Sequence, residues 1–100
     1  MPMTATALYR GAAATGSTTL YTVPAATTTI VTNIVVTNTA ASAATFTITL
    51  DGVAIMSGAT LAANGVAFFD MKQVLATGKI IAGLASATTV NFNISGVQQT

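Results

Sequence analysis

The feature of this chain that most constrains its fold is a strict two-residue alternation of polar and apolar side chains. Residues 45–50 read Thr-Phe-Thr-Ile-Thr-Leu, so every second residue is apolar. Successive side chains of a β-strand point to opposite faces, and this period therefore gives the segment one apolar and one polar face. Residues 90–95 repeat the pattern with Asn and Ser in the polar positions. Both segments are predicted to be half-buried antiparallel strands.

A longer segment, residues 28–38, is partly apolar on both faces. One face carries Ile30 and Ile34, and the other carries Val31 and Val35 beside polar residues. This pattern predicts a central strand, or a strand whose outer face meets another subunit. Thr makes up about a fifth of the chain and fits a pleated surface well. Ala is equally abundant and favours helix, but the two-residue period favours strands.

Turn signals separate the predicted strands. Asp51-Gly52 has the two-residue spacing of a type I′ hairpin, and Asn64-Gly65 and Thr77-Gly78 mark further turns. Pro24 ends an early strand over residues 19–23, because proline donates no hydrogen bond to a ladder. These signals divide the chain into short strands.

The fold class predicted from these patterns is all-β, a small antiparallel β-sandwich of about seven to eight short strands with an N-terminal arm. Residues 1–17 are expected to form the arm and its linker, and residues 18–100 the sandwich domain. Residues 70–76 lack a clear alternation, and we expect at most one short turn of helix there. The predicted core residues are Ile30, Ile34, Val36, Phe46, Ile48, Leu50, Phe68, Ile80, Leu84, Val90, Phe92 and Ile94.

Charge is scarce in this chain. Only 5% of the residues are charged and the net charge is +1, whereas ordinary soluble domains carry roughly 25% charged residues. Scattered cations form no phosphate-binding patch, so no nucleic-acid partner is expected. No apolar run approaches the length of a membrane span, and no membrane partner is expected. The first residues lack the pattern of a signal peptide, so we expect a chain that is kept in the cytoplasm after synthesis.

Residue types that carry most catalytic chemistry are missing. The chain has no His and no Cys, which removes the usual general bases, zinc ligands and thiol nucleophiles. Asp51 is placed in a turn and Asp70 at a segment start, so no carboxylate pair is expected to face one cleft. Lys72 and Lys79 are expected to be solvated. The sequence therefore predicts a protein that is not an enzyme, with no cofactor and no metal.

The N-terminal segment holds the candidate contact residues. Tyr and Arg are enriched at interface hot spots, and Tyr9, Arg10 and Tyr21 lie in or near this segment. The alternative interpretation is that the two tyrosines make no contact with a partner and only close one end of the core. The predicted protein-interface residues are Thr6, Ala7, Leu8, Tyr9, Arg10 and Tyr21.

Five segments, in their order along the chain, carry a family resemblance. They are residues 20–25, 29–38, 46–52, 70–75 and 90–97, and the last of them reads Val-Asn-Phe-Asn-Ile-Ser-Gly-Val. Together they resemble a pattern in small structural proteins of tailed bacteriophages, over roughly residues 8–97. The resemblance implies a β-sandwich component of the virion, in the head or the tail, without catalysis.

These observations lead us to expect a capsid decoration (cement) protein that binds the outside of a phage head. Its expected partners are the major capsid protein or other virion proteins and further copies of itself, with a trimer favoured. Its expected location is the virion, after assembly in the host cytoplasm. A small tail protein of the tube or tip is the first alternative. A carbohydrate- or host-surface-binding module is the second, and it would need a cleft lined by aromatic and polar side chains.

Overall fold

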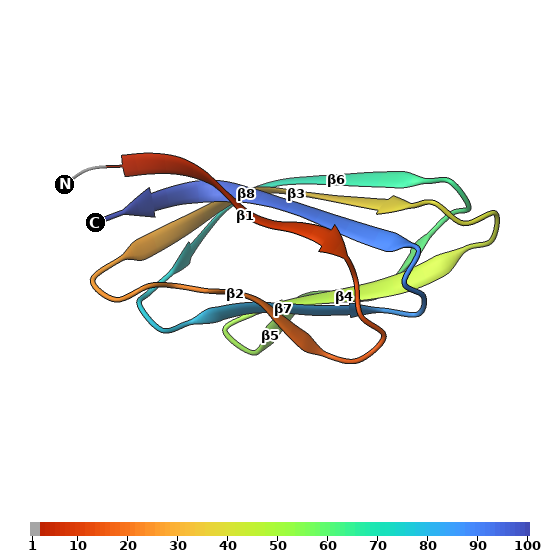
Figure 1. Cartoon of the computed structure of the whole chain (residues 1–100), viewed down its shortest axis with the longest axis horizontal. Coiled ribbons are helices and arrows are strands. Elements are labelled where there is room, and N and C mark those ends of the chain that lie inside the picture. Colours follow the sequence, from red (N-terminus) through yellow and green to blue (C-terminus); the bar gives the residue numbers. More distant parts are fainter. Residues whose placement is uncertain (1–2) are drawn as a thin grey trace.

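The computed structural model describes residues 3–100, and its regular structure consists of β-strands alone (Figure 1). Residues 3–100 contain no helix, which confirms the predicted all-β class. The eight strands are β1 (Met3–Ala12), β2 (Thr18–Thr22), β3 (Thr28–Asn38), β4 (Ala44–Leu50), β5 (Val53–Leu61), β6 (Val66–Leu75), β7 (Ile80–Ala85) and β8 (Val90–Gln99).

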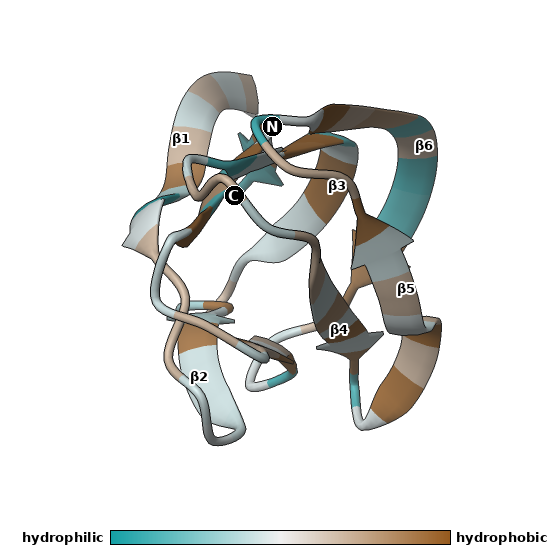
Figure 2. Cartoon of the chain, turned by 90° about the vertical axis from the view of Figure 1, so that its right-hand side faces the viewer, coloured by the Kyte–Doolittle hydropathy of each residue, from teal (hydrophilic) through white to brown (hydrophobic). Residues whose placement is uncertain are grey.

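The strands form two antiparallel sheets of four strands each, which pack face to face. Sheet A has the strand order β1-β8-β3-β6, and sheet B has the order β2-β7-β4-β5. Figure 1 shows the two layers and places the start of β1 and the end of β8 at the same end of the molecule. Figure 2 gives the view along the long axis, with β1, β3 and β6 in one layer and β2, β4 and β5 in the other. The predicted small antiparallel β-sandwich is confirmed.

The chain folds back on itself at the β4–β5 turn, so that its first strand pairs with its last. β4 pairs with β5, β3 with β6, β2 with β7 and β1 with β8, and successive pairs alternate between the sheets. This is the arrangement of an eight-stranded jelly roll. Asp51 and Gly52 have φ values of 53° and 78° at the central turn. Both residues of a type I′ turn need positive φ, and the predicted hairpin is confirmed.

The core lies between the sheets and follows the alternation seen in the sequence. Phe46 of β4 and Phe92 of β8 are buried from opposite sheets, with ring centroids 6.3 Å apart and an angle of 65° between their planes. Phe46 also meets Phe69 of β6 at 6.2 Å. The residues buried as predicted are Ile34, Val36, Phe46, Ile48, Leu50, Val90, Phe92 and Ile94.

β3 changes the face that it buries part-way along its length. Its register with β8 shifts around Thr32, which is the extra residue of a β-bulge. Thr29 and Val31 are buried before the shift and Ile34 after it, so Ile30 points away from the core and is half-buried. The prediction that Ile30 shares the core face with Ile34 is therefore wrong. One inserted residue reverses a two-residue period.

β6 includes residues 70–75, so the helical interpretation of this segment is wrong. Pairing with β3 holds this segment in an extended conformation as far as Leu75. Ala67 and Phe69 pack against the core from one face of β6. Phe68 lies on the opposite face with 73% of its surface exposed, so its predicted place in the core is also wrong.

β7 contributes other core side chains than those predicted, so the predicted places of Ile80 and Leu84 in the core are wrong. Ile81 and Ala85 are buried, whereas Ile80 and Leu84 are only half-buried. Leu84 pairs with Thr47, which lies on the outer face of β4. Ile80 and Leu84 therefore both belong to the outer face of sheet B, because residues an even number of positions apart on a strand point to the same face.

Residues 3–12 form an edge strand of sheet A. β1 pairs with β8 from Met3 opposite Gln99 to Ala12 opposite Asn91. The segment 6–10, which was expected to be an arm, therefore lies within the sheet, because β8 supplies its hydrogen-bond partners. Residues 13–17 connect β1 to β2 and cross from sheet A to sheet B.

A bulge in β1 and a glycine in β8 fit together. The register shifts between Ala7 and Tyr9, and the extra residue, Leu8, is buried. A Cβ atom at Gly96 would lie 2.9 Å from Leu8 Cδ1 and would press against the carbonyl oxygen of Ile30. The backbone of Ile30 can move little within the sheet, so this position needs a glycine.

Replacing Gly96 by Ala should destabilise the fold. The added methyl group overpacks the space between Leu8 and the Ile30 carbonyl, and we expect a loss of about 1–3 kcal/mol in the free energy of unfolding. Chemical denaturation measures this loss. Gly16→Ala is the matched control, because nothing lies within 4 Å of a Cβ atom at Gly16. Equal effects of the two substitutions would contradict the close approach at Gly96.

Truncating the aromatic contact between the sheets should have a larger effect. Phe46→Ala and Phe92→Ala each leave a cavity in the core, and we expect each to cost about 3–5 kcal/mol in unfolding free energy. Phe68→Ala is the control, because Phe68 is exposed, and it should cost less than about 1 kcal/mol at low protein concentration. A comparable loss for all three variants in denaturant titrations would refute the assignment of faces.

Candidate interaction site

Two of the charged residues form an ion pair on the surface of the described chain. Lys79 Nζ lies 3.6 Å from Asp51 Oδ1 beside the central turn, and both side chains are about half-exposed. An exposed pair of this kind contributes little to stability. Among residues 3–100, no three His, Cys, Asp or Glu side chains gather as metal ligands would. The same part of the chain holds no helix that is long and apolar enough to cross a membrane.

The predicted interface residues of β1 divide between the two faces of sheet A. Ala7 and Arg10 are exposed on the outer face. Leu8 is buried in the core, and Thr6 is half-buried on the inner side. Tyr9 packs against the core, and its hydroxyl donates a hydrogen bond to the carbonyl oxygen of Ala12 at 3.0 Å. Only Ala7 and Arg10 of this group share one outward-facing surface.

Tyr21 belongs to a polar cluster that joins the two sheets at one end of the sandwich. Its hydroxyl lies 2.9 Å from Thr29 Oγ1 and accepts a hydrogen bond from Gln98 Nε2 at 2.6 Å. Thr29 is fully buried, so this partner satisfies a hydroxyl that has no access to water. This cluster agrees with the alternative interpretation of Tyr21, in which the side chain closes one end of the core. A contact of Tyr21 with a partner stays a prediction.

The outer face of sheet A carries three exposed large apolar side chains, those of Val66, Phe68 and Val74. Pairing places its outward side chains in four rows that run across β1, β8, β3 and β6, since directly paired residues share a face. In this order, the rows are Ala12–Asn91–Thr37–Val66, Arg10–Asn93–Val35–Phe68, Ala7–Ser95–Asn33–Asp70 and Ala5–Val97–Ile30–Val74.

These rows make the outer face of sheet A asymmetric. Alanine fills every row position of β1 except that of Arg10. The corresponding positions of β6 hold Val66, Phe68, Asp70 and Val74, and the three apolar ones are exposed by 48%, 73% and 66%. Figure 2 shows both apolar and polar bands on β6. The outward side chains are therefore mostly small along the β1 edge of this face and mostly larger along the β6 edge.

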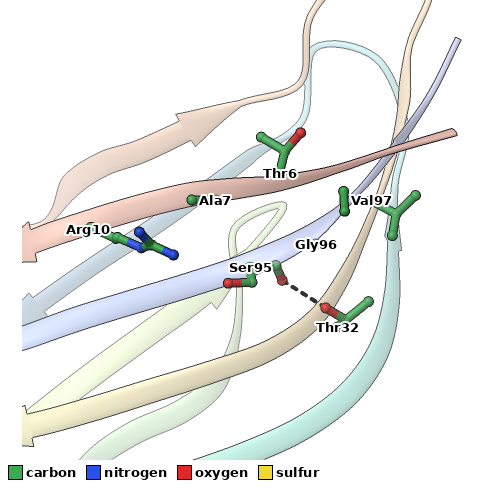
Figure 3. A pocket seen from close by; sticks show the side chains of 8 residues that line it. Thr6, Ala7, Arg10, Thr32, Ser95, Gly96 and Val97 are labelled. Atoms are coloured by element: carbon green, nitrogen blue, oxygen red, sulfur yellow. Dashed lines mark hydrogen bonds between the residues drawn. The ribbon is translucent and has the colours of Figure 1, made fainter.

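A depression of about 350 Å³ lies on this face, over β1 and β8. Figure 3 shows Arg10 at one end of it and Val97 at the other, with Ala7 and Ser95 between them. Thr32 forms part of the wall, and its Oγ1 donates to the carbonyl oxygen of Ser95 at 3.2 Å. The depression exists because β1 and β8 present small side chains there.

Sequence reasoning missed the apolar group on β6, although the sequence holds a signal for it. Asp70 and Lys72 occupy the same alternate positions of this segment as Val66, Phe68 and Val74. Alternate positions of a strand share one face, and two charged residues on a face indicate that it is exposed to solvent. Phe68 therefore belongs to the outer face together with the charges, and Phe69 to the core.

Comparison of the chain with models of known protein families, with curated protein sequences and with solved structures finds no match.

Removing the Tyr21 hydroxyl should destabilise the fold measurably. Tyr21→Phe leaves Thr29 Oγ1 without its partner in a buried position, and we expect a loss of about 1–3 kcal/mol in unfolding free energy. Tyr9→Phe is the control, because its hydrogen bond to Ala12 is exposed, and its loss should be smaller. Thermal and denaturant unfolding measure both. An unchanged stability of Tyr21→Phe would show that the cluster does not hold the sheets together.

Proposed function

We propose that this chain is a non-enzymatic structural subunit of a bacteriophage virion, and that it decorates the outside of the capsid. The observation that carries the proposal is the exposed apolar group of Val66, Phe68 and Val74 on one sheet face of a chain with few charges. Large apolar side chains that are exposed on one face of a small domain are typical of a protein interaction site. The sequence resemblance to phage structural proteins supports the virion as the place of that interaction.

The composition of the surface supports a role in assembly. A freely diffusing domain normally carries many charges, which keep it soluble and monomeric. This chain carries three cations and two anions among its 100 residues. A subunit that is covered by its neighbours needs fewer charges, and weak contacts suffice when a lattice offers many copies of the binding site.

The architecture is compatible with this role without deciding it. Eight-stranded jelly rolls are frequent in viral capsid proteins, and they also occur in lectins and cupins. A shared architecture does not fix a function, whereas the exposed side chains of the surface decide what the chain can bind. The partners in this proposal are the major capsid protein, or another virion protein, and further copies of the chain.

The depression on sheet A supports a protein partner better than a carbohydrate. Its lining consists of Ala, Thr, Ser, Gly, Val and one Arg, and it includes no aromatic ring. A sugar site would need aromatic surfaces and several convergent polar groups. Small side chains beside a shallow hollow instead suit an inserted side chain of another protein.

Locating the chain in the particle tests the proposal. The chain carries an affinity tag in the phage that encodes it, and electron microscopy with a labelled ligand finds the tag. We expect label at regular positions on the head, and heads without the chain should lose DNA at a lower temperature. Purified chain added back should restore the heat resistance of those heads. Label confined to the tail, or absent from purified particles, would overturn the proposal.

A further inference from the structure

We propose that two copies of the chain pack through the outer faces of their sheets A, around a twofold axis that runs parallel to the strands between β8 and β3. This rotation turns one face onto the other and places β6 of each copy over β1 of its partner. Residues of the same row then face each other, because rotation about an axis parallel to the strands does not change the position of a residue along that axis. The inference concerns self-association and does not depend on a location in a virion.

Side-chain size supports this particular arrangement. Val66 of one copy faces Ala12 of the other, Val74 faces Ala5, and Asp70 faces Ala7. In three of the four rows a larger side chain of β6 thus meets an alanine of β1, and in the remaining row Phe68 meets Arg10. The depression next to Ala5 and Ala7 is the space that β6 of the partner would enter. A twofold interface must be self-complementary in this way.

Charge supports the same arrangement. Arg10 and Asp70 have no ion-pair partner within residues 3–100. In the paired faces, Arg10 of one copy lies opposite Phe68 of the other and one row from its Asp70. A guanidinium over an aromatic face is attracted to it, and a nearby carboxylate adds to this attraction. Each pairing occurs twice, because the axis relates the two copies.

The other face-to-face twofold axis, perpendicular to the strands, fits less well. It would place β6 over β6 and β1 over β1. With the axis at the middle of the four rows, Val66 of one copy would face Val74 of the other, while Ala12 of one β1 faced Ala5 of the other across a gap. Poor packing of this kind forfeits the dispersion contacts that an interface needs.

The area of the face is sufficient for a weak to moderate dimer. Four strands about 4.8 Å apart and about nine residues long span roughly 20 by 30 Å, or about 600 Å² for each copy. The two copies together would bury about 1,200 Å², above the roughly 1,000 Å² that a specific interface needs. Sheets that pack face to face also tolerate a difference of about 30° in strand direction, which the sheet twist introduces. The resulting unit is a dimer, in place of the trimer that the sequence favours.

Measuring the mass in solution tests the pairing. Light scattering and sedimentation equilibrium on the purified full chain should give twice 9.9 kDa, falling to 9.9 kDa on dilution. Ala7→Trp fills the depression and should reduce the mass to that of a monomer at all concentrations, although it adds apolar surface. Ala54→Trp is the matched control on exposed β5 of sheet B, and it should leave the dimer intact. Circular dichroism checks that both variants are folded.

Cross-linking tests the orientation, and the absence of Cys from the chain makes it selective. Ala7→Cys and Asp70→Cys variants are mixed and treated with a short bis-maleimide. Ala7 and Asp70 lie three strands apart in one chain, about 14 Å, but face each other between copies. We expect linked dimers in the mixture and few in either variant alone.

Three results would overturn the pairing. The first is a monomeric wild-type chain at the highest soluble concentration. The second is a dimer that survives Ala7→Trp, which would place the contact elsewhere. The third is efficient cross-linking of the Asp70→Cys variant alone, which would indicate that β6 lies over β6. None of these results bears on where the chain sits in a phage particle, so this inference and the proposed function can fail separately.

Discussion

The contact of Phe46 in sheet B with Phe92 and Phe69 in sheet A joins the two halves of the structure. The rings of Phe46 and Phe92 meet edge-on at a centroid distance of 6.3 Å, and those of Phe46 and Phe69 are tilted at 6.2 Å. Such pairs contribute more than their buried area alone. Their positions follow from the two-residue period of β4 and β8, and this period also fixes which side chains point outward. The outer face of sheet A is therefore a consequence of the same alternation that builds the core.

The sequence predicted the parts of the fold that depend on local alternation and turn chemistry. The strands at residues 45–50 and 90–95 and the Asp51-Gly52 hairpin all have the predicted conformation. The bulge at Thr32 could not be predicted, because it depends on the register with β8 and β6. The extended conformation of residues 70–75 likewise comes from pairing with β3, which overrides the local preference.

The candidate site was only partly accessible to sequence reasoning. Ala7 and Arg10 lie on the outer face, whereas Leu8 is buried and the Tyr21 hydroxyl bonds within the sandwich. The pairing of β1 with β8 divides the segment between two faces, and that pairing is a long-range property. The apolar group on β6 was visible in the alternate positions that it shares with Asp70 and Lys72. Its relation to the alanines of β1 depends on the jelly-roll order, which puts both strands at the edges of one sheet.

The central claim is that the outer face of sheet A binds protein and first of all a second copy. The most direct test is the change in backbone amide NMR shifts when the concentration of isotope-labelled chain is raised. We predict shifts for the outward residues of β1 and β6, from Ala5 to Ala12 and from Val66 to Val74, with little change at Thr45, Thr47 and Thr49 on sheet B. Shifts concentrated on sheet B, or none up to the solubility limit, would contradict it.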